Sequence, residues 1–309
     1  MGNTAMAYRQ PLPDVQSGRG ELSDIALDWV GMQDIALPLE VAGRPFNAEV
    51  SVGVSVCANR DGARGIHMSR LYLTLDALTQ GELTPRRIIN TLAACLQSQS
   101  ADSARVRLEI GGELLLSRAA LLSPQRGWKS YPLHISATLE RRPTLTLQVG
   151  VPYSSTCPAS AALSRQAAQQ QFLVDIETDD GALEVQQVFD WLGAHGMPAT
   201  PHSQRSWAWV TVTLSGDEKV LPAISLIDRI EQALGTPVQT LVKRQDEQAF
   251  ALANGRNLMF CEDAARRLHD ALRRAGCYRA FSVRVEHQES LHAHNAVAQL
   301  SWREGADAA

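Results

Sequence analysis

Three histidines and two glutamates gather in one short stretch near the end of the chain, E-H-Q-E-S-L-H-A-H-N, at residues 286–295. Because side chains alternate in an extended segment, His292 and His294 are expected to point to the same side. Two imidazoles on one face can bind a metal ion or transfer protons. The alternative is a solvated loop between two strands, which composition alone favours.

A lone cysteine, Cys157, follows a strand-like run in V-P-Y-S-S-T-C-P-A-S at residues 151–160. Other polar clusters are T-P-H-S-Q-R-S (200–206), K-R-Q-D-E-Q (243–248), F-C-E-D (260–263) and G-I-H-M-S-R (65–70). A thiolate, an imidazole and a carboxylate could together bind a borderline divalent ion such as zinc and leave one position for water. Spacing does not establish such a site, because each cluster also reads as a polar turn, a wet surface or a helix cap.

The first half of the chain contains the elements that would carry these side chains. Residues 1–24 are polar and rich in Pro and Gly, and we interpret them as an extended N-terminal arm. Period-two alternation predicts a strand over residues 46–56. Further strands are expected at residues 70–76, 104–110 and 133–151, the last broken near 142–143. Thr84 as N-cap and Pro85 at the first helical position predict a helix with one apolar face.

The second half repeats this order loosely. It predicts strands at 207–214, 281–285 and 296–302, and helices at 221–234 and 262–275. Helical stretches at 160–171 and 185–192 form a surface insertion at about 160–199. The order of strands, helices and strands in each half favours an α+β fold with antiparallel sheets. We therefore expect an arm at 1–24, a first module at 25–150 and a second module at 151–309.

Composition narrows the functional classes. The formal net charge is −4 and no basic stripe is present, so we expect no nucleic acid as partner. No P-loop or G-x-G-x-x-G sequence occurs. The five cysteines are odd in number and widely spaced, unlike a disulfide framework. The first residues lack the apolar core of a signal peptide, and no apolar run approaches the roughly 18 residues of a membrane span, so we expect a cytoplasmic protein without a membrane partner.

The polar clusters, taken together and in order, resemble the type IB GTP cyclohydrolases, a prokaryotic GTP cyclohydrolase I family of the tunnelling-fold superfamily. The motifs that carry the resemblance are L-P-D-V-Q at Leu12, L-D-W-V-G-M at Leu27, G-I-H-M-S-R at Gly65, S-S-T-C-P at Ser154, H-S-Q-R-S at His202, K-R-Q-D-E at Lys243, E-D at Glu262 and E-S-L-H-A-H-N at Glu289. Each motif is weak alone, but the ordered set is specific and covers about residues 12 to 300.

The resemblance implies two tandem tunnelling-fold modules in each chain, with antiparallel sheets and helices on one face, and assembly as a homotetramer. It implies hydrolytic opening of the imidazole ring of GTP, which yields formate and 7,8-dihydroneopterin triphosphate in the first step of folate biosynthesis. It also implies a divalent metal ion, with zinc, manganese or iron used by different members.

The family's residues carry over onto this chain position by position. Cys157, His202 and Glu247 would bind the metal ion, and Cys157 would thereby take part in catalysis. Glu289 would bind the guanine edge, where a carboxylate can accept two N–H bonds. Glu262, His292 and His294 would handle protons. The candidates for the triphosphate, on charge and position, are Arg205, Arg70, Lys243 and Arg244.

One position departs from the family pattern. The family usually has C-P-C, and this chain has C-P-A, with Ala159 in place of the second thiol. This departure encourages one other reading beside the hydrolase, an inactive relative. Two more readings stay open. One is a relative that stops at a different pterin product, and the other is a tunnelling-fold oxidoreductase that acts on a deazaguanine with a cysteine nucleophile and a nicotinamide cofactor.

Overall fold

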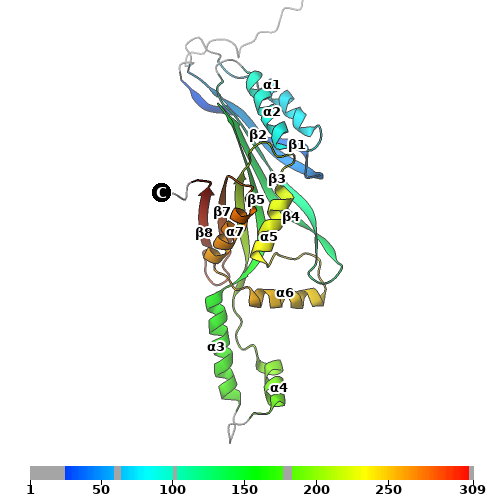
Figure 1. Ribbon diagram of the computed structural model, residues 1–309, viewed down its shortest axis with the longest axis vertical. Helices are drawn as coiled ribbons and strands as arrows, with labels where there is room; N and C mark the ends of the chain where they lie inside the picture. Colours follow the sequence, from blue (N-terminus) through cyan, green and yellow to red (C-terminus); the bar gives the residue numbers. More distant parts are fainter. Residues whose placement is uncertain (1–24, 59–63, 100–102, 177–182, 306–309) are drawn as a thin grey trace, which may run out of the picture.

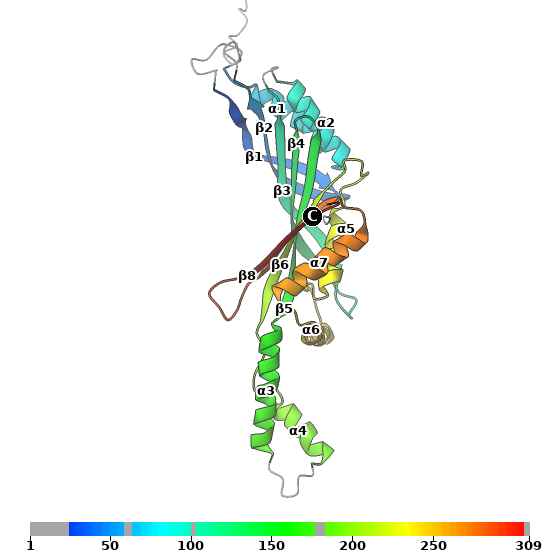
Figure 2. The same ribbon diagram turned by 60° about the vertical axis from the view of Figure 1, so that its left-hand side comes forward.

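A computed structural model describes residues 25–58, 64–99, 103–176 and 183–305. They form one eight-stranded sheet in which each strand pairs antiparallel with the next along the chain. Helices cover one face of this sheet, and α3 and α4 project from one end of it (Figures 1 and 2). The predicted α+β architecture with antiparallel pairing is confirmed. The expected arm at residues 1–24 lies outside the described residues.

The first half of the chain supplies four strands and the helices that cover them. Its elements are β1 (Leu27–Val41), β2 (Arg44–Val56), α1 (Met68–Leu75), the short 3-10 helix η1 (Asp76–Thr79), α2 (Pro85–Gln97), β3 (Val106–Ala119) and β4 (Arg126–Leu139). The predicted start of α2 is confirmed, because Thr84 Oγ1 accepts a hydrogen bond of 3.2 Å from the backbone N–H of Arg87. A cap of this kind contributes about 1 kcal/mol.

The second half has the same order with an added pair of helices. Its elements are β5 (Pro143–Thr156), α3 (Pro158–Asp175), α4 (Val185–His195), β6 (Ser203–Thr213), α5 (Ala223–Leu234), α6 (Arg244–Arg256), α7 (Cys261–Ala275), β7 (Ala280–His287) and β8 (Ala296–Arg303). Apart from α3 and α4, which lie between β5 and β6, both halves thus run strand, strand, helices, strand, strand. Residue 150 lies inside β5, so we propose that the two modules meet between Leu139 and Pro143 instead.

Two expectations about the first half were wrong or incomplete. Residues 70–76 do not form a strand, because Leu71 and Leu75 are buried one helical turn apart while Leu73 between them is exposed. They belong to α1. The strand β1 was not predicted, and its register shifts twice, between Leu27 and Val30 and between Met32 and Ile35. These irregularities remove the period-two pattern by which a strand is recognised.

The sheet opens between β4 and β5, and a connecting segment fills the gap. Among the described residues, β4 and β5 pair only from Leu133 opposite Val149 to Leu139 opposite Pro143. Beyond that point residues 236–241, here called the strap, take the place of the missing pairing. The backbone N–H of Ser154 on β5 donates to the carbonyl of Thr236 over 2.8 Å. On the β4 side, a Cβ at Gly127 would lie 2.1 Å from Thr240 Oγ1, so only glycine allows this approach.

The core lies between the sheet and its covering helices. Alternate residues of the central strands are fully buried, including Val149, Val151 and Tyr153 of β5 and Ala208, Val210 and Val212 of β6. The helices α5 and α7 close this face over the second half of the sheet (Figure 2). All five cysteines are free thiols, as the odd, wide spacing predicted. Within the described part of the chain, no helix is long and apolar enough to cross a membrane.

Candidate functional site

The backbone brings Cys157 and His202 together at one end of the sheet. Cys157 follows β5 and caps α3, and His202 precedes β6. The N–H of Cys157 donates to the carbonyl of His202 over 3.3 Å, and the N–H of His202 donates to Ser160 Oγ over 3.1 Å. The chain therefore leaves the sheet into α3 and returns from α4 at nearly the same point (Figure 1). The predicted insertion does not separate the two residues.

The imidazole of His202 is oriented by two polar neighbours. Its Nδ1 lies 3.1 Å from Gln204 Oε1 and 3.6 Å from Glu289 Oε2. Since an amide oxygen can only accept, Nδ1 is the donor in this contact, and in the neutral form of the imidazole Nε2 would be the nitrogen with the lone pair. Among the described residues Nε2 has no hydrogen-bond partner, and a metal-binding histidine characteristically donates from its other nitrogen in this way. The His202 side chain is 20% exposed, so this nitrogen can be reached.

Glu289 contributes a half-satisfied carboxylate to the same place. Its Oε1 accepts a hydrogen bond of 3.3 Å from Gln204 Nε2. Its Oε2 is buried and accepts no hydrogen bond from any described residue. A buried carboxylate oxygen without a donor is unfavourable in the isolated chain, and a ligand that brings N–H groups would satisfy it. The sequence-based prediction for Glu289 thus falls on a side chain with an open hydrogen-bonding position.

The first turn of α7 holds Glu262 beside a thiol and near a buried imidazole. Asp263 Oδ2 caps the helix by accepting the N–H of Phe260 over 3.0 Å, which leaves Glu262 exposed and outside the cap. The N–H at the helix start and the Cys261 thiol, 3.2 Å away, lower the pKa of Glu262. Burial and the Glu262 carboxylate raise the pKa of the Cys261 thiol to about 11. Glu262 is therefore the ionised partner of this pair.

The loop between β7 and β8 carries His292 and His294. Their rings stack with centroids 5.0 Å apart and planes 8° apart, so they share one side as predicted. The segment is a bent loop, however, and not the extended strand from which the prediction was made. Both side chains are exposed. Ser290 Oγ reaches the carbonyl of Ser203 at the start of β6 over 3.5 Å. This contact folds the loop over the end of the sheet where His202 lies.

Glu247 lies elsewhere, on the first turn of α6. The turn is anchored by Asp246, whose buried carboxylate accepts the N–H groups of Leu122 and Ser123 in the β3–β4 turn and that of Lys243. Burial opposes the charge on Asp246, but the hydroxyl of Ser123 and these N–H groups lower its pKa well below the usual value. The charge run at residues 243–248 is otherwise exposed, as its composition predicted.

The other end of α6 is the one that approaches Cys157. Asn257 Nδ2 donates to the carbonyl of Leu234 over 2.7 Å, and the N–H of Met259 donates to the carbonyl of Thr156 over 3.2 Å. Glu247 precedes Asn257 by ten residues, which is roughly 15 Å along a helix axis. Figure 1 shows α6 crossing below the sheet between α3 and the β3–β4 turn. Within one described chain, no three His, Cys, Asp or Glu side chains form a group that could hold a metal ion.

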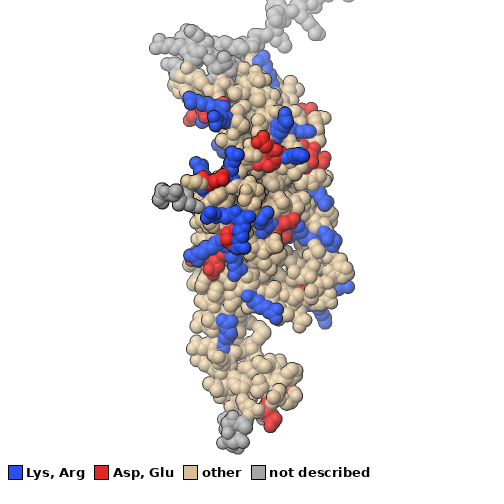
Figure 3. Space-filling view, viewed as in Figure 1, with Lys and Arg blue, Asp and Glu red and all other residues tan. Residues whose placement is uncertain are grey.

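The basic residues expected near the triphosphate are dispersed. Arg205 lies on β6 next to Gln204, and strand alternation directs its exposed side chain to the opposite face of the sheet. Lys243 is exposed at the start of α6. Arg70 lies on α1, where its Nη1 donates to the carbonyl of Ser98 over 3.2 Å, at the end of the molecule opposite α3 (Figure 2). Figure 3 shows charged side chains over the body of the molecule and few over α3 and α4.

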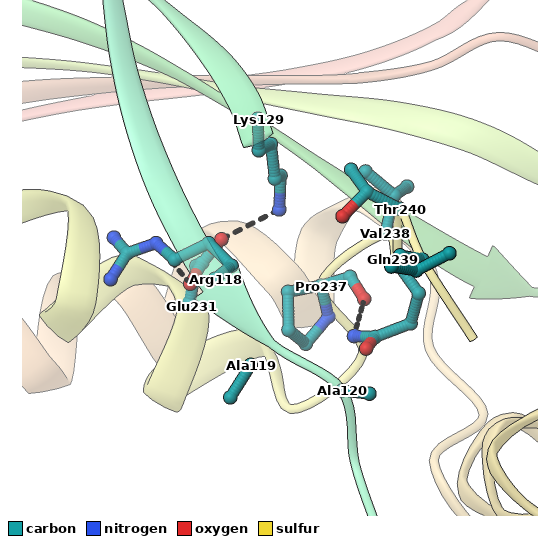
Figure 4. Close-up of a pocket in the computed structure, with 10 residues that line it drawn as sticks. Arg118, Ala119, Ala120, Lys129, Glu231, Pro237, Val238, Gln239 and Thr240 are labelled. Carbon is teal, nitrogen blue, oxygen red and sulfur yellow. Dashed lines mark hydrogen bonds and ion pairs between the residues drawn. The ribbon is translucent and has the colours of Figure 1, made fainter. Parts of the chain in front are cut away.

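A polar cavity of about 190 Å³ lies between β4, α5 and the strap (Figure 4). Lys129 Nζ enters it and lies 2.6 Å from Glu231 Oε1, which also accepts the Tyr131 hydroxyl over 2.6 Å. Burial lowers the pKa of Lys129, and Glu231 offsets part of that effect. Arg118 pairs with Asp228 and Glu231, so the two positive charges are matched by two negative ones. We interpret this cluster as the attachment of α5 to the sheet.

Sequence reasoning missed the buried side chains beneath the site. His287, which ends β7, is 2% exposed and its Nε2 lies 2.8 Å from the Tyr153 hydroxyl. Alternation along β7 was the available signal, because His287 follows Val283 and Val285 on the buried face. Alternation along β6 places Gln204 on the same buried face, but it gives no sign of its bond to Glu289. The buried bonds of Asp246 to Leu122 and Ser123 carried no local signal, because these partners are distant in the sequence.

Comparison with known proteins identifies the family that this chain matches. The family model described as "Type I GTP cyclohydrolase folE2" matches residues 12–298. A GTP cyclohydrolase FolE2 of Serratia proteamaculans is 67% identical over 309 residues, covering 100% of both chains. One of Pseudomonas putida is 52% identical over 295 residues, covering 94% of this chain and 96% of the relative.

Solved structures support the fold. The uricase of Arthrobacter globiformis superposes with a TM-score of 0.53 at 6% identity, covering 90% of this chain and 94% of the uricase. Likeness at this level of identity concerns the fold alone, and it agrees with the predicted tunnelling-fold architecture.

Proposed function

This chain belongs to the type I GTP cyclohydrolase FolE2 family, and on that premise we propose that it hydrolyses the imidazole ring of GTP. The products are formate and 7,8-dihydroneopterin triphosphate, at the entry to folate biosynthesis. The observation that carries the proposal is the convergence of Cys157, His202 and Glu289 at one end of the sheet. The free thiols are consistent with a reducing compartment, and we propose the cytoplasm.

The residues present fit a divalent metal ion. Cys157 offers a half-buried thiol that accepts the N–H of Ser160 over 3.5 Å, and His202 offers its Nε2. A thiolate, an imidazole and a carboxylate suit zinc, manganese or iron. When bound, the ion would supply the Lewis acidity that makes a water acidic enough to deprotonate near neutral pH.

We propose that the third ligand, Glu247, comes from a neighbouring copy of the chain. Within one chain it is held roughly one helix length from Cys157 by the bonds of Asp246 at one end of α6 and Asn257 at the other. Its side chain is exposed, as a contribution to another subunit requires. A closed homo-oligomer, for which we propose a tetramer, would repeat the same contact at every site.

The remaining residues bind the substrate and move protons. Glu289 accepts the N–H groups of the guanine edge through the oxygen that lacks a donor. Glu262 gives up and takes back protons as water adds to the purine carbon and the ring nitrogens leave. His292 and His294, the exposed and stacked pair on the β7–β8 loop, handle protons together with Glu262. The basic residues Arg205, Arg70 and Lys243 bind the triphosphate, and some of them do so from a neighbouring subunit.

Incubation of metal-stripped protein with GTP, with zinc, manganese and iron restored one at a time, tests this function. We expect formate release and pterin fluorescence after oxidation, both dependent on the added ion. Cys157→Ala should lose metal retention and turnover together. Glu262→Ala should keep the metal but lose turnover. The inactive reading encouraged by Ala159 predicts that no ion supports formate release. The oxidoreductase reading predicts no formate either, but oxidation of a reduced nicotinamide in a separate incubation with a deazaguanine.

A further inference from the structure

A group of four buried polar side chains, here called the ring, lies directly beneath the candidate site. His287 Nε2 lies 2.8 Å from the Tyr153 hydroxyl, and His287 Nδ1 lies 3.4 Å from Ser155 Oγ. Ser155 Oγ lies 2.7 Å from Ser206 Oγ, and Ser206 stands opposite Tyr153 in the β5–β6 pairing. All four side chains are nearly or fully buried. Three adjacent strands, β5, β6 and β7, supply them.

The contacts of His287 have one consistent set of donors and acceptors. The Tyr153 hydroxyl donates to Nε2 of His287, and Nδ1–H of His287 donates to Ser155. Ser155 donates to Ser206. Both imidazole nitrogens are then satisfied, one as acceptor and one as donor. A second proton on His287 would make both nitrogens donors, so the Tyr153 hydroxyl could no longer donate to Nε2.

The charged and titratable groups around His287 come from two packed elements. From α7, the Glu262 carboxylate acts on His287, and Cys261 and Arg267 act on Tyr153. From β5, Tyr153 itself is titratable, and burial raises its pKa far above the usual value. Burial lowers the pKa of His287 to about 4, although Glu262 opposes that shift. The imidazole is therefore uncharged at neutral pH.

The ring residues lie at the strand ends that lead into the site residues. Cys157 follows Ser155 by two residues, Gln204 precedes Ser206 by two, and Glu289 follows His287 by two. The strands pair at these points, with Tyr153 opposite Ser206 and Ser206 opposite His287. A change in the ring therefore moves the backbone that carries the candidate metal-binding and guanine-binding side chains.

We propose that His287 is a positioning residue that acts as a neutral donor and acceptor and exchanges no proton with the substrate. Its ring with Tyr153, Ser155 and Ser206 holds the site-bearing strand ends in place and presents an uncharged imidazole to Glu262. The role in turnover rests on the proposed function. The protonation state and the ring do not, and they can be tested without GTP.

Nuclear magnetic resonance of the full-length protein with labelled histidine provides that test. His287→Gln assigns the His287 signals by their disappearance. We expect a neutral imidazole protonated at Nδ1, with no titration between about pH 5.5 and 8.5. We expect the Tyr153→Phe substitution to raise the pKa of His287 by about half a unit or more, because the lost hydrogen bond favoured the neutral imidazole. A wild-type His287 that titrates near its ordinary pKa overturns the proposal.

Kinetics test the positioning role. His287→Gln should keep kcat/KM within about fivefold, because a neutral amide can accept from Tyr153 and donate to Ser155. Tyr153→Phe should lower kcat/KM about tenfold and move the acid limb of its pH profile to higher pH. Tyr131→Phe is the matched control, since it too removes a buried, hydrogen-bonded tyrosine hydroxyl and should change neither. A folded His287→Gln without turnover, or Tyr153→Phe behaving as Tyr131→Phe does, overturns the proposal.

Discussion

Acidification should destabilise the folded protein through His287, by an amount that the structure allows us to calculate. Burial lowers the folded-state pKa of His287 from 6.5 to about 4. The unfolded chain therefore binds a proton at mildly acidic pH that the folded chain does not bind. The contribution of His287 to stability is complete above the unfolded-state pKa and is lost as the pH falls from there through about 4. Linkage gives a loss of about 2 kcal/mol between about pH 7.5 and pH 5.0.

The assay compares urea unfolding of the wild type and His287→Gln, followed by tryptophan fluorescence at both pH values and one protein concentration. Glutamine does not titrate, so the variant should lose about 2 kcal/mol less than the wild type on acidification. Whatever the substitution costs at the higher pH cancels in this double difference, as do the other histidines. Equal losses in the two proteins, within about 0.5 kcal/mol, would refute the buried neutral imidazole.

Other perturbations address the strap and α6. Gly127→Ala should lower the melting temperature, because the new Cβ would lie 2.1 Å from Thr240 Oγ1, and adding Thr240→Gly should recover part of the loss in a calorimetric scan. If the double variant melts no higher than the single one, Thr240 of the strap does not pack closely against Gly127 of β4. Asp246→Asn should lower the melting temperature, because a buried acceptor of bonds from Ser123 and Lys243 is removed. Exposed Glu247→Gln should leave the melting temperature of the metal-free protein unchanged and reduce its retention of zinc. If Glu247→Gln instead lowers the melting temperature and Asp246→Asn instead reduces zinc retention, Asp246 does not anchor α6 and Glu247 does not bind the metal.

Local patterns in the sequence were sufficient for most elements of the fold. Strands with clean alternation, such as β6, and a helix with a side-chain cap at Thr84 are determined by neighbouring residues, so they could be predicted. The leucines at positions 71, 73 and 75 fit the two-residue period of a strand, and Leu71 and Leu75 also fit the turn of a helix. The rest of the protein buries Leu71 and Leu75, and this burial favours the helix. The irregular register of β1 is stabilised by its partner β2, which no local pattern records.

The site was predictable only as far as the family resemblance reached. It named Cys157, His202 and Glu289, which the structure brings together, but not the ring around His287, whose members come from three strands. The charge run around Lys243 gave no sign that one of its carboxylates, Asp246, is buried, because its donors lie on the β3–β4 turn more than a hundred residues away. Contacts of that range depend on the tertiary fold.

Mixing inactive subunits tests most directly whether each site is completed between copies. Cys157→Ala and Glu247→Ala chains, each inactive alone, would be unfolded together and refolded in equal amounts. If Glu247 reaches Cys157 from another copy, random assembly gives intact sites in about one quarter of positions, and activity should return to about that fraction of the wild type. Refolded mixtures that form mixed oligomers yet stay inactive would contradict the account.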